Sequence, residues 1–116
     1  MISAQMLAQI DLLTAKVVRK RSGYKTRADG SVRPFGGLNI LLFGDWWQLK
    51  PVSGTALFGD PREAPTQTAY HGMQLLWGSP PNAVHRCWHS EESLRCDDVW
   101  YNDFLGQCRR GDLEVD

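Results

Sequence analysis

Two polar side chains that could contact a ligand, Asp45 and Gln48, follow a short apolar run. Residues 38–43 are Leu-Asn-Ile-Leu-Leu-Phe, Gly44 and Asp45 come next, and Gln48 stands three residues after the aspartate. An apolar run of this length between glycines predicts a strand buried on both faces of a parallel sheet. Ligands of open α/β sheets bind just outside the carboxyl ends of such strands. Asp45 and Gln48 therefore stand where a nucleotide phosphate is expected, and an amide can donate to phosphate while accepting from water.

Other side chains near this run admit two interpretations each. Asp45 either orients a water near magnesium or caps the turn that follows it. Trp46 and Trp47 either stack on nucleic-acid bases or pack, one of them at least, in the protein. Arg95 either offers its planar fork of donors to a phosphate or is a solvated surface arginine.

The periodicity of the sequence predicts the elements that position these residues. Residues 1–20 are expected to form a helix with Ser3 as its N-cap. Its apolar stripe recurs at steps of three and four residues and comprises Ile2, Met6, Ile10, Leu13 and Val17. Residues 21–34 are expected to form a surface loop with turns at Ser22-Gly23 and Asp29-Gly30.

Two further helices and one further strand are expected after the apolar run. Residues 69–77 predict a short helix closed by Gly78, and residues 83–88 a short strand. Residues 97–110 predict a longer helix that Gly111 caps. Its expected packing face consists of Val99, Trp100, Phe104, Leu105 and Cys108.

Composition bounds the class of protein. The chain has 116 residues, enough for one domain, and its formal net charge is zero, which disfavours a stand-alone nucleic-acid binder. Basic residues nevertheless concentrate within residues 16–33. This cluster is either a solvated helix end and loop or a patch that faces phosphates.

Three cysteines without a Cys-x-x-Cys pair disfavour a disulfide framework and indicate a reducing compartment. Cys87, His89, Cys96 and His85 match no standard zinc spacing, so no metal site is expected. No apolar stretch approaches the roughly 20 residues that span a membrane.

Three stretches carry a resemblance to a known family. Residues 44–52, Gly-Asp-Trp-Trp-Gln-Leu-Lys-Pro-Val, resemble the third motif (Gly-Asp-x-x-Gln-Leu-Pro-Pro-Val) of the Pif family of 5′-to-3′ DNA helicases, RecD-like motors of superfamily one. Residues 95–111 are similar to a later motif that begins with an arginine. Residues 1–7 resemble the stretch that follows the Asp-Glu-x-Ser motif. The departures are Lys50 in place of a proline and Cys96 in place of a glutamine.

The resemblance implies a fold and a set of site residues. The fold would be α/β: a partial RecA-like P-loop NTPase fold, a parallel sheet flanked by helices, without its N-terminal strands and phosphate loop. Residues 1–116 would be the C-terminal portion of the first motor domain. Gln48 and Arg95 would sense the γ-phosphate as the catalytic residues, and Gly44 and Asp45 would join them in binding nucleotide. A DNA-coupling role would fall to Trp46, Trp47 and Lys50.

The resemblance also implies an activity. The intact parent would use ATP and Mg²⁺ to move along single-stranded DNA and unwind duplexes, in DNA repair, recombination or telomere maintenance. Its partners would be single-stranded DNA and the remaining helicase domains, with no membrane. Its location would be intracellular, in the nucleus or mitochondrion of a eukaryote. This chain contains no Gly-x-x-x-x-Gly-Lys-Ser/Thr loop, and the magnesium-binding acidic pair would precede Met1. The chain alone is therefore expected to be inactive and to bind neither cofactor tightly.

Two other functions remain open from the sequence. A non-catalytic module could bind single-stranded nucleic acid through Trp46, Trp47 and the basic residues, or the motifs could be relics in an interaction module.

Parallel strands without their neighbours leave backbone groups unpaired. The isolated chain is therefore expected to be poorly folded or self-associating.

Overall fold

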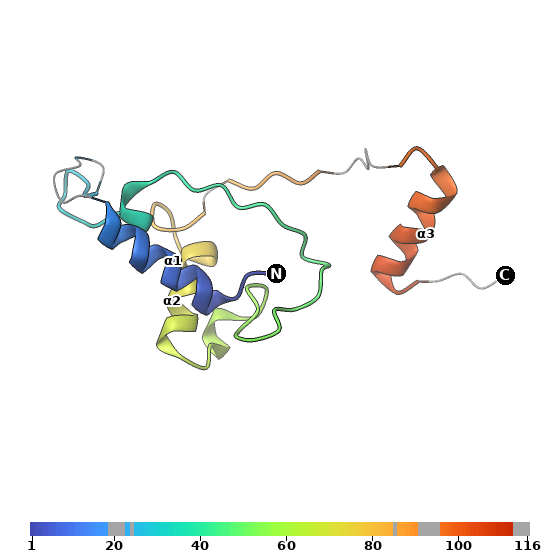
Figure 1. Ribbon diagram of the computed structural model, residues 1–116, viewed down its shortest axis with the longest axis horizontal. Coiled ribbons are helices and arrows are strands. Elements are labelled where there is room, and N and C mark those ends of the chain that lie inside the picture. The colour runs from blue at the N-terminus through green and yellow to red at the C-terminus, as the bar shows by residue number, and fades with distance from the viewer. Residues whose placement is uncertain (19–22, 24, 85, 91–95, 113–116) are drawn as a thin grey trace. The chain divides into compact units, whose positions relative to one another are not determined.

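The described chain consists of helices, turns and irregular segments. The computed structural model describes residues 1–18, 23, 25–84, 86–90 and 96–112. Their elements are α1 (Ala4–Val17), the 3₁₀ turn η1 (Pro34–Gly37), the 3₁₀ turn η2 (Pro61–Glu63), α2 (Gln67–Trp77) and α3 (Val99–Arg110) (Figure 1). The chain divides into two compact units, Met1–Arg86 and Cys87–Asp116.

The predicted parallel sheet is wrong. No strand or sheet occurs among the described residues, which contain only two isolated bridges, Ser3 with Ala56 and Thr26 with Val32. Residues 38–43, and the described part of 83–88, are irregular. A parallel strand needs neighbours from distant parts of the chain, and no described segment forms a strand ladder with either run. The partial RecA-like P-loop NTPase fold expected from the sequence is therefore not what this chain forms.

Helix α1 begins where the sequence predicts but buries a different face. Ser3 is its N-cap and accepts a hydrogen bond from the backbone N–H of Met6 at 3.2 Å. The buried residues of the helix are Ala4, Leu7, Ala8 and Asp11. The predicted stripe is exposed at Met6, Ile10, Leu13 and Val17. The small residues of the buried face explain the difference, because they let a second helix approach closely.

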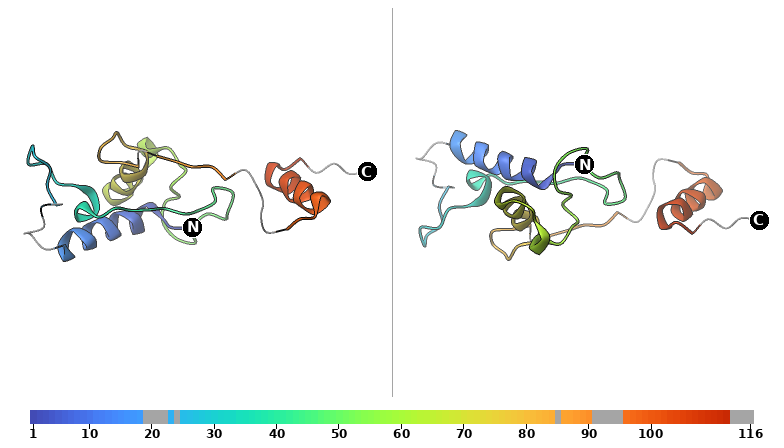
Figure 2. Two further views of the ribbon diagram at one scale, coloured as in Figure 1. Left: turned by 90° about the horizontal axis from the view of Figure 1, so that it is seen from above. Right: turned by 90° about the horizontal axis from the view of Figure 1, so that it is seen from below.

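That second helix is α2, which the sequence predicted to within two residues. Thr66 caps its start, accepting from the N–H of Ala69, and Gly78 ends it. Helices α1 and α2 lie side by side in both views of Figure 2. At their crossing, a Cβ placed on Gly72 would stand 1.8 Å from the carbonyl oxygen of Ala4. Only glycine permits this approach.

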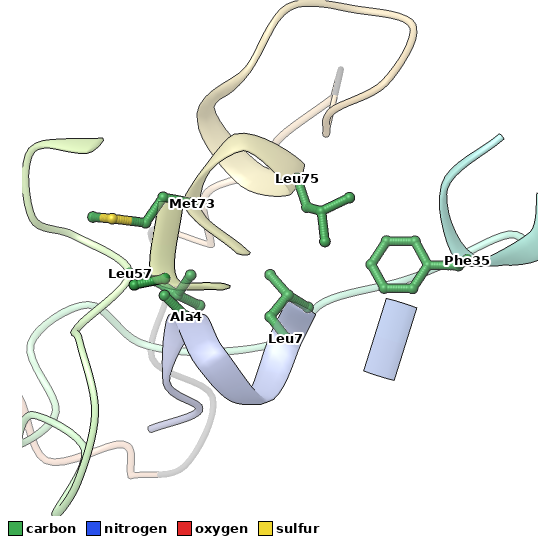
Figure 3. Close-up of a cluster of buried hydrophobic side chains, with 7 residues drawn as sticks. Ala4, Leu7, Phe35, Leu57, Met73 and Leu75 are labelled. Atoms are coloured by element: carbon green, nitrogen blue, oxygen red, sulfur yellow. The ribbon is translucent and has the colours of Figure 1, made fainter. Parts of the chain in front are cut away.

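The hydrophobic core lies between these helices and the loops beside them. Leu7 and Met73 are its largest fully buried side chains. Figure 3 shows them with Leu57, Leu75 and Phe35, which come from three different parts of the chain. The indole N–H of Trp77 donates to the carbonyl of Leu57 and so fastens the loop after residue 52 to α2.

One buried carboxylate ties three elements of the first unit together. Asp11 of α1 accepts a hydrogen bond through Oδ1 from the backbone N–H of Phe35 in η1. Its other oxygen lies 2.8 Å from Nε2 of His71 in α2. Phe35 has φ +53°, a left-handed conformation that costs a side-chain-bearing residue about 1–2 kcal/mol. The bond to Asp11 and the burial of its ring hold Phe35 in this conformation.

Residues 25–33, which belong to the predicted surface loop, form a hairpin-like turn. Lys25 donates to the carbonyls of Ala15 and Val18 at the end of α1, where a cation suits the helix dipole. Arg27 donates to the hydroxyl of Ser31 and to the carbonyl of Pro81. The predicted turn at Asp29-Gly30 is confirmed, and the hydroxyl and backbone N–H of Ser31 lower the pKa of Asp29.

The second unit contains α3, which starts two residues later than the sequence predicted and ends at the predicted cap, Gly111. Asp98 accepts from the N–H of Tyr101, and Gly111 ends the helix with φ +76°. Trp100 and Phe104 stack one turn apart, with ring centroids 5.6 Å apart. None of the helix residues is buried against described residues. The predicted packing face is therefore exposed, because the described part of this unit supplies no second apolar surface for it.

The close crossing of α1 and α2 predicts a strong effect of Gly72→Ala. The added methyl would collide with the backbone of Ala4 and force the helices apart, at a cost of roughly 1–3 kcal/mol or more. Gly106→Ala in α3 is the matched control, because its Cβ meets nothing closer than 3.4 Å. Amide hydrogen exchange of α1 and α2 should accelerate in Gly72→Ala alone. Unchanged exchange in that variant would contradict the observed crossing.

The carboxylate of Asp11 predicts a second effect on stability. Asp11→Ala leaves the buried N–H of Phe35 without its acceptor and should lower the free energy of unfolding by about 1–3 kcal/mol. The half-exposed pair with His71 adds little, since such pairs are worth about 0–1 kcal/mol. Gln9→Ala, at an exposed position of α1, should change stability by less than about 0.5 kcal/mol. Equal effects in urea unfolding of the two variants would show that Asp11 has no such role.

Candidate functional site

The residues that the sequence singled out form a tight turn. The N–H of Gln48 donates to the carbonyl of Asp45 at 3.2 Å, and the N–H of Trp47 donates to Oδ1 of Asp45 at 3.0 Å. Asp45 thus caps the turn, one of the two roles considered for it. Gly44 precedes the turn in open space, since a Cβ there would meet no atom within 4 Å. Neither packing nor a left-handed φ requires glycine at this position.

The turn opens onto a hollow of about 610 Å³. The hollow is lined by the first residue of the chain and by a continuous run that begins two residues after Asp45. The lining residues are Met1, Trp47, Gln48, Leu49, Lys50, Pro51 and Val52. Three of the predicted site residues, Trp47, Gln48 and Lys50, therefore share one surface. Met1 was not predicted there, and no local pattern in the sequence indicates that it would be.

Contacts at the start of α1 bring Met1 to this surface. The N–H of Ala4 donates to the carbonyl of Thr55 at 2.8 Å. The side-chain amide of Gln5 exchanges two further bonds with Thr55, at 2.8 and 3.0 Å. Because residues 3–5 are pinned to residues 55–56, the run that ends at Val52 comes to lie beside the N-terminal residue.

The structure distinguishes the two tryptophans of the turn. Trp46 packs against Trp77 of α2, with ring centroids 5.6 Å apart and planes inclined by 32°. Trp47 is 67% exposed and lines the hollow. The packing interpretation therefore holds for Trp46, and base stacking stays a prediction for Trp47. Trp46 has a packing role, and Trp47 presents a free face of the kind that stacking on a base needs.

Lys50 adds a positive charge to the same surface. Its Nζ lies 5.9 Å from the centre of the Phe58 ring, within the range of a cation–π contact. Of the basic residues within 16–33 that are described, Lys25 and Arg27 are bound to protein acceptors, whereas Lys16 and Arg33 are exposed. Two members of that group therefore hold the hairpin in place, a role that neither sequence interpretation included.

The described residues do not supply a complete site for ATP and Mg²⁺. No group of three or more His, Cys, Asp or Glu side chains within the described part of the chain could hold a metal ion. The turn offers one carboxylate, Asp45, and it accepts a backbone hydrogen bond. Arg95 lies outside the described residues, so Gln48 and Arg95 cannot be placed relative to each other. No step of ATP hydrolysis can be assigned to the described residues alone.

Comparison with known proteins adds no relative. No protein-family model, no curated protein and no solved structure matches this chain. None of the helices in the described ranges has the length and apolar character needed to cross a membrane.

Proposed function

We propose that this chain is a segment of a Pif-type ATP-dependent DNA helicase, in which residues 44–48 form a turn that responds to the nucleotide. The observation that carries the proposal is that Met1 and Gln48 line one hollow. The resemblance matches residues 1–7 to the stretch that follows the magnesium-binding carboxylates of the family. The glutamine that would sense the γ-phosphate thus lies beside the point where those carboxylates would join the chain.

The chemistry of the turn fits this role. Phosphoryl transfer depends on positioned donors and on a metal near the γ-phosphate. The amide of Gln48 can donate to a phosphate oxygen and accept from water at once. Open space at Gly44 would let a ligand approach the backbone. The predicted sheet, which the described residues lack, has no part in this role of the turn.

A second candidate function rests on Trp47. Its exposed ring shares the hollow with Lys50, and a stacking aromatic beside a cation is the combination that single-stranded nucleic acids bind. On this proposal the chain binds a strand without nucleotide. A motor and a simple binding module differ in whether Gln48 matters, so the two candidates can be separated by experiment.

Substitution of Gln48 tests the helicase proposal. The 116-residue chain should show no magnesium-dependent ATP hydrolysis. The product of the full reading frame that contains it should show DNA-stimulated hydrolysis. In that product Gln48→Ala should lower kcat by about 100-fold, the typical effect of losing one positioned donor.

Gln9→Ala is the control, since this glutamine is exposed on α1 and should leave kcat unchanged. Hydrolysis by the 116-residue chain that disappears with Gln48→Ala would refute the expected inactivity. Unimpaired hydrolysis by Gln48→Ala in the longer product would refute the sensing role.

Substitution of Trp47 tests the binding candidate. Anisotropy of a labelled oligothymidylate should reveal salt-sensitive binding without nucleotide. Trp47→Ala should weaken that binding roughly 5- to 150-fold, equivalent to about 1–3 kcal/mol per stacked base. Trp88→Ala removes a tryptophan of the second unit that is 78% exposed, and it serves as the control. Absence of binding, or an equal loss in both variants, would count against the candidate.

A further inference from the structure

The segment that lines the hollow is held at both of its ends by an aromatic ring. At its start, Trp46 packs against Trp77 of α2, with ring centroids 5.6 Å apart. At its end, the ammonium of Lys50 lies 5.9 Å from the centre of the Phe58 ring. Both distances lie within the ranges over which such pairs attract each other. The residues between the two contacts, which line the hollow, are Trp47, Gln48 and Leu49.

The two contacts are joined through one residue, Trp77. Its indole N–H donates a hydrogen bond to the carbonyl of Leu57, and Phe58 directly follows Leu57 in the chain. The ring of Trp77 therefore holds the start of the lining segment. Its N–H holds the loop that supplies the aromatic ring for the end of the same segment. Because the side chain of Leu57 is buried in the core, this loop is also attached to the rest of the unit.

Core packing does not account for Trp77. Its side chain is 52% exposed, and the described core cluster around Leu7 and Met73 does not include it. The described residues that line the hollow do not include it either. Its partners are instead a neighbour of the lining segment and the loop before Phe58. The contacts of Trp77 thus point to a role in holding the wall of the hollow.

We propose, resting on the strand binding put forward for Trp47, that Trp77 is a positioning residue for single-stranded nucleic acid at the hollow. Through Trp46 it fixes the direction in which the ring of Trp47 meets a base. Through the loop at Phe58 it fixes the place of the Lys50 ammonium, which contacts a phosphate of the same strand. Groups that are already in place lose less freedom when a ligand binds, so this arrangement raises the affinity for the strand.

Substitution of Trp77 in the 116-residue chain tests this role. In anisotropy measurements with a labelled oligothymidylate, Trp77→Leu should weaken binding roughly 2- to 12-fold, the factor that corresponds to loss of an aromatic pair. Trp46→Leu removes the same ring contact without changing α2 and should weaken binding to a similar extent. Helix content should not change in either variant, because both side chains lie outside the described core cluster.

Tyr70→Leu is the matched control. Tyr70 is another half-exposed aromatic residue of α2, at 41% exposure, and takes part in neither of the two aromatic contacts. Its substitution should leave the affinity for oligothymidylate unchanged. Equal weakening by Tyr70→Leu and Trp77→Leu would overturn the positioning role of Trp77.

A thermodynamic cycle with Trp47 separates positioning from a general loss of structure. If Trp77 acts through Trp47, Trp77→Leu should weaken binding less in the Trp47→Ala background than in the otherwise unchanged chain. Partial unfolding would instead lower the affinity by the same factor in both backgrounds. An additive cycle would therefore overturn the route through Trp46.

The salt dependence of binding provides a second readout, for Lys50. Loss of one phosphate contact to a single strand lowers the slope of log Kd against log salt by about 0.7, and Lys50→Ala should show this change. Trp77→Leu should lower the slope in the same direction, because the loop at Phe58 no longer holds the ammonium. Partial unfolding would leave the slope unchanged, and an unchanged slope would overturn the route through Phe58.

The same measurements distinguish failure of this role from failure of strand binding itself. Binding that Trp47→Ala weakens and Trp77→Leu leaves intact would overturn the role of Trp77 while strand binding stands. Absence of oligothymidylate binding by the unchanged chain would overturn both.

Discussion

The arrangement of the first unit depends on the carboxylate of Asp11. Its two oxygens engage the backbone of η1 and the imidazole of α2, so one side chain joins three segments that are far apart in sequence. A buried carboxylate of this kind is tolerated only because its partners replace the water that it loses. It also holds Phe35 in a left-handed turn, and this turn sets the direction in which residues 38–43 leave the helices.

The position of the candidate site depends on the helices and on η1. From η1 the chain runs as an exposed apolar segment to the turn at Asp45, and the pinning of Gln5 to Thr55 brings the segment after that turn back to Met1. Trp46 then anchors the turn on α2 through Trp77. Gln48 and Trp47 consequently share one hollow.

Local signals predicted the helices well and the long-range pairing badly. Ser3 and Gly111, with the periodicity between caps, located α1 and α3 because capping is decided within a few residues. The buried face of α1 could not be predicted, since it depends on Gly72, more than sixty residues away. The structure of residues 38–43 could not be predicted either. Their apolar character predicts a strand, but a strand also needs neighbouring strands from elsewhere in the chain, and a local pattern does not reveal whether these are present. Capping by Asp45 was foreseeable from the sequence, whereas the roles of Met1, Asp11 and Trp77 appear only in the fold.

The most direct test of the helicase assignment is to determine the coding sequence that precedes Met1 in the transcript. The account predicts an open frame that encodes a Gly-Lys-Ser/Thr loop, followed by Asp-Glu-x-Ser immediately before Met1. Those residues would supply the phosphate cradle and the magnesium carboxylates that the hollow beside Gln48 lacks. An in-frame stop codon before Met1, or an open frame without these motifs, would contradict the assignment and leave strand binding through Trp47 as the function to pursue.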